Sequence, residues 1–390
     1  MFWSEYGRIN EREDTKIMDY ENIYIHIPFC AQKCDYCGFY SEANPSSSRI
    51  KVFLDKLENK LEALDLSKPA KTLFFGGGTP SLLSPRELQR LHLMVKKHIP
   101  LNPDTEISME CNPETICQDR LEVIKPMINR MSIGVQAFSN TFLNTLGRSS
   151  SQEHIEKALH LAKNFNFDNL SVDLIYGIPG QTQDDWLSNL KIAVNADIKH
   201  ISCYSLTMEE GSELVNKLDS FAPIEDDESA EMWIKTGDFL EQQGFSRYEV
   251  SNYAQPGAEC KHNVNIWHGQ AYLGLGPAAS SFDGRLRWTE PASLDDWLAD
   301  KEPEKDFIEP EYRLIEIFII GLRTVEGWTR SHWENIPLQQ QMNVEWQLMV
   351  KKALKVKKVY PDLLDVSPKA IRLTQKGLLF WNTIAEAWLE

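Results

Sequence analysis

The chain has 390 residues, of which 42% are hydrophobic and 25% are charged, and its formal net charge at pH 7 is −16. The composition is ordinary for a globular protein, and the length allows roughly two or three domains. The acidic balance argues against a nucleic-acid partner, because phosphate groups are bound by clustered basic residues. We find neither the roughly 18 consecutive apolar residues that span a bilayer nor a signal-peptide core. We therefore expect a cytoplasmic protein.

Short β-rich runs alternate with longer amphipathic segments between residues 21 and 245. Six consecutive βα units with apolar strands indicate a parallel sheet buried on both faces. Nearly every strand is followed by polar or glycine-rich residues, as in barrels whose functional groups gather at the carboxyl ends of the strands. The sequence therefore predicts an α/β fold, a partial (β/α)6 TIM-like barrel. The strands are expected at 22–27, 71–77, 106–111, 130–137, 170–177 and 200–207, and the helices at 49–64, 85–98, 117–128, 151–165, 183–195 and 226–243.

The pattern changes after residue 245. Residues 246–305 are rich in aromatic, glycine and small residues, which predicts a loop-rich connection packed against the barrel. Residues 306–390 look helical, and 370–384 resembles the last strand and helix of a winged-helix module. We thus expect a polar leader at 1–20, the barrel at 21–245, the connection, and a mostly helical, winged-helix-like C-terminal domain.

Three of the seven cysteines, Cys30, Cys34 and Cys37, follow the first expected strand, and polar neighbours place them on a loop. The other four are scattered, which fits one metal site in a reducing compartment better than a disulfide framework. A zinc knuckle or a structural role is the weaker alternative, because no second cysteine pair stands at zinc-finger spacing. A [4Fe–4S] cluster on three thiolates leaves one iron open. The CxxxCxxC spacing with Tyr36 resembles the radical S-adenosylmethionine superfamily, in which S-adenosylmethionine chelates that iron.

Other strand ends offer groups suited to that cofactor. In GGGTP (76–80), Gly77 and Gly78 let the backbone approach a ligand and present its N–H and C=O groups, although a tight turn alone would also use glycine. Carboxylates suit ribose hydroxyls or an ammonium group, an arginine pairs with a carboxylate, and an amide both donates and accepts. These groups are Glu110, Gln136, Arg148 and Asp173.

The chain resembles the family of oxygen-independent coproporphyrinogen oxidase and its relatives from about residue 20 to its end. The resemblance lies, in order, in YIHIPFCAQKCDYC, FFGGGTPSLL, ECNPET, SIGVQAF, LGRSSS, DLIYGIPGQT, GFSRYEVSNYA and KHNVNIW. It implies that S-adenosylmethionine is bound at the matching positions. These are Tyr24, Tyr36, Gly77, Gly78, Thr79, Glu110, Gln136, Arg148 and Asp173.

Two branches of this family differ at the position of Phe39. The oxidase carries a further cysteine there and a longer N-terminal extension, whereas this sequence has phenylalanine and an expected leader at 1–20. It therefore resembles the HemW-type heme chaperones. That resemblance implies heme as the bound molecule, heme-acceptor proteins such as membrane-associated respiratory enzymes as partners, and a reductant protein for the cluster.

The chaperone branch is marked by an HNxxYW motif implicated in heme binding. Here His262, Asn263 and Trp267 match, and Ile266 stands at the tyrosine position. An imidazole suits an axial iron ligand, and an aromatic ring can stack on a macrocycle. The thiol of Cys260 is a second candidate ligand. We expect this segment to lie near the strand ends where the cluster sits.

Three functions stay open on the sequence alone. The first is a heme chaperone that uses its cluster and S-adenosylmethionine in a regulatory or redox role. The second is the radical oxidative decarboxylation of coproporphyrinogen III, and the third is a radical enzyme acting on another substrate. No catalytic residue is assigned, so whether the protein is an enzyme is left open.

Overall fold

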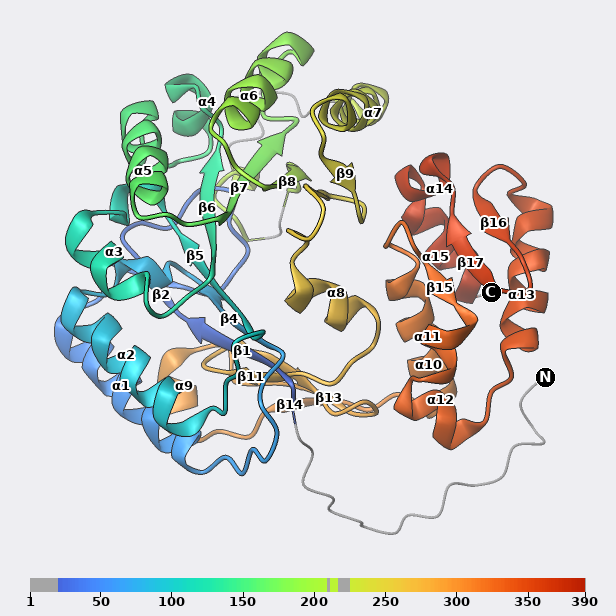
Figure 1. The fold of residues 1–390 in the computed structure, drawn as a ribbon, viewed down its shortest axis with the longest axis horizontal. Coiled ribbons are helices and arrows are strands. Elements are labelled where there is room, and N and C mark those ends of the chain that lie inside the picture. The colour runs from blue at the N-terminus through green and yellow to red at the C-terminus, as the bar shows by residue number, and fades with distance from the viewer. Residues whose placement is uncertain (1–19, 209–210, 217–224, 390) are drawn as a thin grey trace.

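The computed structural model describes residues 20–208, 211–216 and 225–389, so the leader expected at 1–20 lies outside it apart from Tyr20. The six expected strands are consecutive neighbours in a nine-stranded sheet of order β11-β1-β4-β5-β6-β7-β8-β10-β9, and they pair in parallel (Figure 1). The sheet does not close between β11 and β9, and the predicted partial barrel is confirmed. The six strands are β1 (Asn22–Ile27), β4 (Thr72–Gly77), β5 (Glu106–Cys111), β6 (Arg130–Gln136), β7 (Asn169–Tyr176) and β8 (His200–Ser205).

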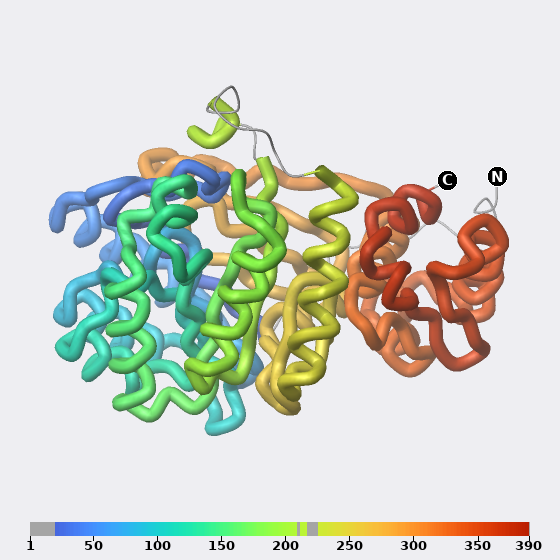
Figure 2. The backbone as a smooth tube through the Cα atoms, turned by 90° about the horizontal axis from the view of Figure 1, so that it is seen from above, coloured from blue at the N-terminus to red at the C-terminus, as the bar shows by residue number. Residues whose placement is uncertain are grey.

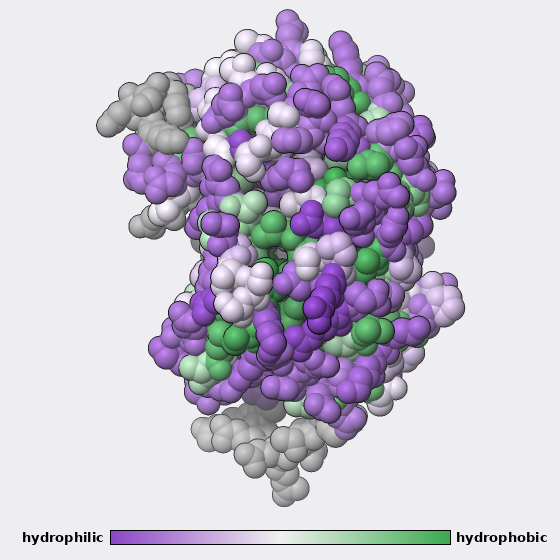
Figure 3. Space-filling model, turned by 90° about the vertical axis from the view of Figure 1, so that its left-hand side faces the viewer, coloured by the Kyte–Doolittle hydropathy of each residue, from purple (hydrophilic) through white to green (hydrophobic). Residues whose placement is uncertain are grey.

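Helices cover the outer face of these strands, and their exposed surface is largely hydrophilic (Figure 3). Most begin where expected, because a serine or threonine accepts a hydrogen bond from an amide of the first turn. The third helix ends earlier than expected because Pro126 follows it. Among the described helices, none is long and apolar enough to cross a membrane. They are α1 (Ser47–Glu62), α2 (Pro85–His98), α3 (Gln118–Ile124), α5 (Gln152–Asn164), α6 (Gln183–Asn195) and α7 (Asp226–Gln242), with the unexpected short α4 (Asn140–Thr145).

The strands alternate between the helical layer and the barrel interior. On β1, Ile23, Ile25 and Ile27 are fully buried, whereas Tyr24 and His26 line an internal cavity. Short elements follow several strands and turn the chain at the carboxyl end of the sheet. They are β2 (Phe29–Cys30), β3 (Glu42–Ala43), η1 (Pro80–Leu82) and η2 (Pro113–Thr115).

The connecting segment is more regular than the expected loop. β11 pairs in parallel with β1 and β10 pairs antiparallel with β8, so this segment extends both edges of the sheet. Its strands have only two or three residues, too few for a periodic pattern in the sequence. The elements are β9 (Ser246–Arg247), β10 (Asn252–Ala254), α8 (Lys261–Trp267), β11 (Leu273–Leu275), β12 (Ser280–Phe282), β13 (Arg287–Thr289), α9 (Leu294–Leu298) and β14 (Glu304–Asp306).

The C-terminal segment forms a separate helical module beside the barrel (Figure 2). Its antiparallel sheet has the order β15-β17-β16, and buried Phe318, Trp328, Trp333 and Trp388 pack together in its core. A mostly helical module with this small sheet agrees with the winged-helix-like prediction, while the boundaries of the four parts stay a prediction. Its elements are α10 (Pro310–Gly321), β15 (Trp328–Thr329), α11 (Arg330–Glu334), α12 (Pro337–Met342), α13 (Trp346–Val359), β16 (Leu364–Val366), β17 (Ala370–Leu373), α14 (Gln375–Leu379) and α15 (Trp381–Leu389).

Candidate functional site

The three clustered cysteines lie on one loop that begins at β2, beyond the carboxyl end of β1. The main chain of this loop is fixed at Asp35, whose N–H donates to the carbonyl of Leu146 at 3.1 Å and whose carbonyl accepts from the amide of Leu214 at 2.7 Å. All seven cysteines of the chain are free thiols. The loop thus presents Cys30, Cys34 and Cys37 from a backbone that other parts of the barrel hold in place.

The close approach of two segments to this loop requires glycine. Gly147 has φ +65°, and a Cβ there would lie 2.3 Å from the carboxyl carbon of Asp35. Gly78 lies as close to the chain after β1, where a Cβ would stand 2.6 Å from the carbonyl oxygen of Phe29. Both glycines are therefore required for the packing around the cysteine loop.

Arg148 connects the cysteine loop to the strands. Its Nη1 lies 3.6 Å from the Sγ of Cys34, and its Nη2 donates to the carbonyl of Gly134 at 2.6 Å and to Asn112 Oδ1 at 3.1 Å. Burial raises the pKa of the Cys34 thiol, while the charge of Arg148 and its hydrogen bond oppose that rise. The guanidinium therefore favours the thiolate form that a metal ligand needs.

Asn112 extends this network to a second cysteine. Its Nδ2 donates to Thr79 Oγ1 at 2.9 Å, and Thr79 Oγ1 lies 3.6 Å from the Sγ of Cys30. Asn112 was missed in the sequence, although it lies in the ECNPE segment at the end of a strand. A polar residue at a strand end of a barrel is the signal that would have found it.

The glycine-rich segment after β4 uses its amides within the protein. The N–H of Gly77 donates to Glu110 Oε2 at 3.1 Å, and the N–H of Gly78 donates to the carbonyl of Ile27 at 2.9 Å. The amide of Thr79 donates to the carbonyl of Phe29 at 2.7 Å. These three N–H groups are therefore paired within the protein, and the contact of Gly77 and Gly78 with a ligand stays a prediction.

A cavity of about 470 Å³ runs inside the barrel, within the usual size range of small-molecule sites. Tyr24, Gly77, Glu110 and Asp173 line it together with residues of α8. The hydroxyl of Tyr24 also lies 3.1 Å from Nδ1 of the cavity residue His26. The structure thus joins these predicted cofactor residues to the predicted heme-binding segment in one space.

Two buried carboxyl groups, those of Glu110 and Asp173, line this cavity together with the guanidinium of Arg130. Burial, and then the neighbouring Asp173, raise the pKa of Glu110 to about 8. The hydroxyl of Ser132 donates to the carboxylate of Asp173, and its Oγ lies 3.2 Å from each carboxylate oxygen. Burial raises the pKa of Asp173 as well. The carboxyl groups of Glu110 and Asp173 offer acceptor oxygens to sugar hydroxyls or to a cationic amine, and a bound amine would favour their ionised form.

Gln136 and Tyr36 complete the set of predicted cofactor residues. Gln136 has φ +67° at the end of β6, where the pairing with β7 shifts register after Gly134. A left-handed conformation at a residue other than glycine is strained, and such strain concentrates at functional sites. Tyr36 packs against a small apolar cluster that includes Phe142 and Ile175. Burial raises the pKa of Tyr36, so its hydroxyl stays neutral.

His262 is a buried, neutral imidazole on α8 whose Nδ1 lies 2.8 Å from Thr72 Oγ1. Thr72 donates its hydroxyl hydrogen to Asn22 Oδ1 at 3.0 Å, so it accepts from Nδ1–H of the histidine. Burial, and then the charge of Arg130, lower the pKa of His262 to about 3. The remaining lone pair is therefore on Nε2, the arrangement found in histidines that ligate metals.

The sequence predicted that the heme motif would lie near the strand ends where the cluster sits, but α8, which carries it, lies elsewhere. The amides of Lys261 and His262 both donate to Glu106, the first residue of β5, at 3.0 Å. Thr72, which contacts His262, is the first residue of β4. Since the cluster loop lies at the carboxyl ends of the strands, α8 closes the opposite, amino end of the barrel. The predicted heme motif and the cluster loop are therefore separated by the cavity.

The motif residues do not all face that cavity. His262, Asn263 and Ile266 line it. Trp267 instead packs 6.3 Å from the ring of Tyr248 and lies under the guanidinium of Arg323 at 4.7 Å. The motif therefore divides between the barrel interior and the contact with the C-terminal module.

Cys260 is a poor candidate for a heme ligand. Its Sγ lies 3.8 Å from Oε1 of the buried Glu106. Burial raises the pKa of this thiol to about 12, so the thiolate is disfavoured at neutral pH. The alternative ligand considered from the sequence is therefore not favoured by the structure.

Several cavity residues escaped prediction because the strands were interpreted as uniformly apolar. Polar and aromatic side chains recur at every second position of β6 and β8, and the residues at these positions share one face of a strand. That alternation is the signal that could have identified them. The missed residues on the six strands are His26, Phe74, Arg130, Ser132, His200, Ser202 and Tyr204.

Comparison with known proteins identifies the family of the chain. Residues 24–193 match the Radical SAM superfamily. A protein of Synechocystis named heme chaperone HemW is 36% identical over 331 residues, 80% of each chain. The HemW of Escherichia coli is 35% identical over 323 residues, 79% of this chain and 84% of its own, and that of Lactococcus lactis is 28% identical over 94% of this chain and 96% of its own.

Among solved structures, coproporphyrinogen III oxidase of Escherichia coli, described as a radical SAM enzyme, superposes with a TM-score of 0.81. It is 24% identical and the match covers 94% of this chain and 89% of the oxidase, which shows a shared fold. The HemW proteins of Synechocystis and Escherichia coli are 36% and 35% identical over 80% and 79% of this chain, which shows a shared family as well as a shared fold. The chain belongs to the HemW family within the radical SAM superfamily.

Proposed function

We propose that this protein is a heme chaperone that binds heme and transfers it to acceptor proteins. The observation that carries the proposal is the shared cavity: His262 and Asn263 line it from one end, and Gly77 and Glu110 from the other. Relatives that match four-fifths of the chain are named heme chaperones. A bound heme and the cofactor site would thus lie in one connected space.

We propose further that Cys30, Cys34 and Cys37 hold a [4Fe–4S] cluster whose open iron is coordinated by S-adenosylmethionine. Three free thiols on a fixed loop fit the cluster, and Arg148 beside Cys34 balances thiolate charge. The Nε of Arg148 is buried and has no hydrogen-bond partner among the described residues, so a donor is available for a carboxylate. When bound, the cluster and its ligand supply one-electron chemistry.

The remaining cofactor residues have distinct proposed roles. Glu110 and Asp173 accept hydrogen bonds from the ammonium group or ribose, and Gln136 holds the ligand by its amide. Tyr36 lies within the cysteine loop, where it packs against the apolar cluster that includes Phe142 and Ile175 and limits access of water. The remaining proposed contacts are Tyr24, Gly77, Gly78 and Thr79.

In the heme site, His262 Nε2 would ligate the iron while its Nδ1–H stays with Thr72. Asn263 lines the cavity beside it, and Trp267 supports α8 from the other side. Phe39 also lines the cavity and is 72% exposed, so an aromatic ring stands at its opening where the oxidase branch has a cysteine. An exposed aromatic ring is suited to contact with a macrocycle.

The proposed partners follow from this role. They are heme, acceptor proteins such as membrane-associated respiratory enzymes, and a reductant protein that serves the cluster. We place the protein in the cytoplasm, where its seven free thiols stay reduced. We propose no nucleic-acid partner, since the net charge is −16.

Heme titration of the anaerobically reconstituted protein tests the proposal. The wild-type protein is expected to bind heme with a defined Soret band, and His262→Ala to shift that band and weaken binding about tenfold. His160→Ala is the matched control, because His160 is exposed on α5. An unaltered titration and spectrum for His262→Ala would remove this residue from the site, and a wild-type protein that binds no heme would overturn the chaperone proposal.

The shared fold with the oxidase makes decarboxylation the alternative to exclude. The reconstituted protein is incubated with coproporphyrinogen III, S-adenosylmethionine and a strong reductant, and the products are separated by chromatography. We expect unchanged coproporphyrinogen, in agreement with Phe39 in place of the additional cysteine. Formation of protoporphyrinogen would establish the enzyme activity instead.

A further inference from the structure

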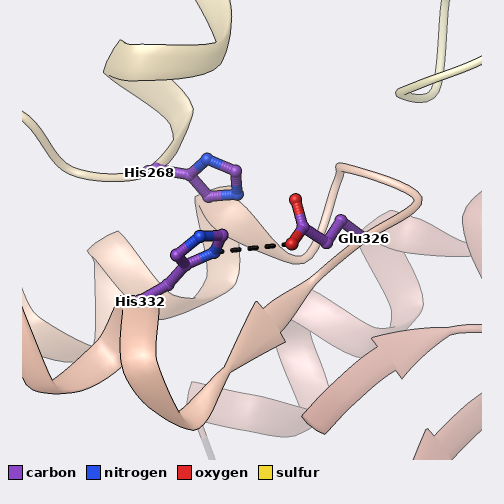
Figure 4. A group of neighbouring side chains, drawn as sticks. All are labelled: His268, Glu326 and His332. Carbon is purple, nitrogen blue, oxygen red and sulfur yellow. Dashed lines mark ion pairs between the residues drawn. The ribbon is translucent and has the colours of Figure 1, made fainter.

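Two histidines and a glutamate converge where α8 meets the C-terminal module (Figure 4). His268 follows the last residue of α8, Glu326 precedes β15, and His332 lies on α11. Their side-chain ligand atoms all lie within 4.8 Å of one another. Three segments that are distant in the sequence thus bring two imidazoles and a carboxylate to one point.

The junction that carries these residues is firmly held. The fully buried carboxylate of Glu249 accepts from Nε and Nη2 of Arg323 at 3.0 and 2.8 Å. Next to it, the amide of Val325 donates to the carbonyl of Tyr248 at 3.0 Å. Gly269, with φ +71°, packs so closely on α10 that a Cβ would stand 2.5 Å from Ile317. The backbone segments that carry the three ligand groups are therefore held by contacts that do not involve those side chains.

The ring of His268 is oriented but its Nε2 lacks a partner. The ring meets the edge of buried Trp328 with 5.5 Å between centroids, and Trp328 is fixed by its Nε1 donating to the carbonyl of Phe318 at 2.7 Å. Nε2 of His268 is buried and has no hydrogen-bond partner among the described residues. A buried polar atom without a partner is costly, and a ligand bound at Nε2 would remove that cost.

The spacing of the other two residues resembles ligands around a metal more than a direct pair. His332 Nδ1 lies 3.7 Å from Glu326 Oε1, beyond hydrogen-bond distance. Ligand atoms around a tetrahedral zinc ion, with bonds of about 2.1 Å, are separated by about 3.4 Å. Small side-chain rotations would bring all three groups to that separation, because Glu326 and His332 are about half exposed.

We propose that His268, Glu326 and His332 bind a divalent cation of the zinc class and that the ion clamps α8 to the C-terminal module. Two imidazoles and one carboxylate are a ligand set that zinc uses with a fourth position left to water. The geometry favours a small ion over a bis-histidine heme, since the two imidazole centroids are 5.3 Å apart and both rings converge with the Glu326 carboxylate on one point. The proposal stands independently of heme binding at His262.

Zinc titration of the full-length protein tests this proposal. The experiment uses the Cys30→Ala/Cys34→Ala/Cys37→Ala variant, because free thiolates would bind zinc themselves. Calorimetry with zinc chloride is expected to show one equivalent bound. His332→Ala and Glu326→Gln should each weaken binding at least tenfold, while the exposed control His160→Ala should not. Both test residues are partly exposed, so their variants should fold, and circular dichroism checks this.

Two further measurements separate the outcomes. Cobalt(II) in place of zinc is expected to give only weak d–d bands, because nitrogen and oxygen ligands lack the thiolate charge-transfer band. Zinc should raise the melting temperature of the parent variant but not that of His332→Ala. Absent zinc binding, or binding that survives His332→Ala unchanged, would overturn the site. A heme titration that is lost in His332→Ala would assign these residues to heme instead.

Discussion

The cysteine loop and α8 both carry a short motif, but the motifs behave differently in space. In the loop, Cys30 and Cys34 are drawn into one network through Thr79, Asn112 and Arg148. On α8 the motif residues divide, because positions five apart on a helix point about 140° away from each other. A ligand motif in a loop therefore predicts a site directly, whereas a motif on a helix must first be resolved into faces.

The cysteine loop gives the largest expected effect in this comparison. Replacing Cys30, Cys34 or Cys37 by alanine removes one of only three thiolate ligands, so stable cluster loading should be lost. Iron analysis and the visible spectrum after anaerobic reconstitution measure it. The wild-type protein should hold four irons per chain, as a cubane cluster requires.

Cysteines outside the loop serve as matched controls for that experiment. Cys111→Ala, Cys117→Ala and Cys203→Ala should leave the iron content unchanged, because these thiols lie elsewhere in the barrel. If Cys30→Ala kept four irons with the wild-type spectrum, the cluster assignment would be wrong and the contrast with α8 would fall with it.

Arg148 tests whether the network around the loop also serves the cofactor. Losing a charge-assisted hydrogen bond costs about 1.5–3 kcal/mol, so Arg148→Ala should bind S-adenosylmethionine roughly ten- to a hundredfold more weakly. Calorimetry on reconstituted protein measures this affinity. The variant should also be less stable, since the carbonyl of Gly134 loses its buried donor.

The control for Arg148 is Arg86→Ala, since Arg86 is exposed on α2. Its affinity should equal that of the wild-type protein. Iron analysis of Arg148→Ala separates a lost ligand contact from a lost cluster. Unchanged affinity with a complete cluster would show that this arginine only supports the fold around Cys34.

The sequence predicted the barrel well because its signals are local. Each of the six strands is found within two residues of the expected range, since runs such as 106–111 combine β-branched or apolar residues with a polar end. Helix starts were equally clear because capping residues such as Ser84 stand directly before the first turn. The cysteine loop was predictable for the same reason, since its spacing is contained in eight residues.

The placement of α8 could not be predicted because long-range contacts decide it. Glu106 accepts from amides 155 and 156 positions later in the chain, and Asn22 accepts from Asn265 Nδ2 at 2.8 Å across 243 positions. The seven residues of α8 and the three-residue strands around it carry too little periodicity to show where they pack. Helix geometry alone could have predicted only that the motif residues point to two different faces of α8.

The cavity between the two regions should make stability depend on pH. With the pKa of Glu110 raised from 4.5 to about 8, the folded protein keeps a proton between these values that the unfolded chain releases. The free energy of unfolding should therefore fall as pH rises from 4.5 to 8, by up to about 1.4 kcal/mol per pH unit from this group. Denaturant unfolding of cluster-free protein at several pH values measures the slope.

Glu110→Gln should flatten that slope, because the amide does not titrate in this range. Glu122→Gln is the control, since Glu122 is exposed on α3. The part of the slope that Asp173 contributes should persist in both variants. An identical slope for Glu110→Gln and wild type would mean that the carboxyl is ionised in the folded protein.

The smallest expected effect concerns the face of α8 that looks into the cavity. Ile266 lines the cavity one turn from His262, where the family motif has tyrosine. Ile266→Tyr would place a hydroxyl donor and an aromatic ring there, and one hydrogen bond contributes about 0.5–1.5 kcal/mol. Heme affinity should therefore rise roughly two- to twelvefold, measured by Soret titration. Trp267→Phe is the contrasting variant, because Trp267 faces Arg323 outside the cavity and should leave the Soret band in place. Equal changes in the two variants would show that α8 does not divide its motif between two faces.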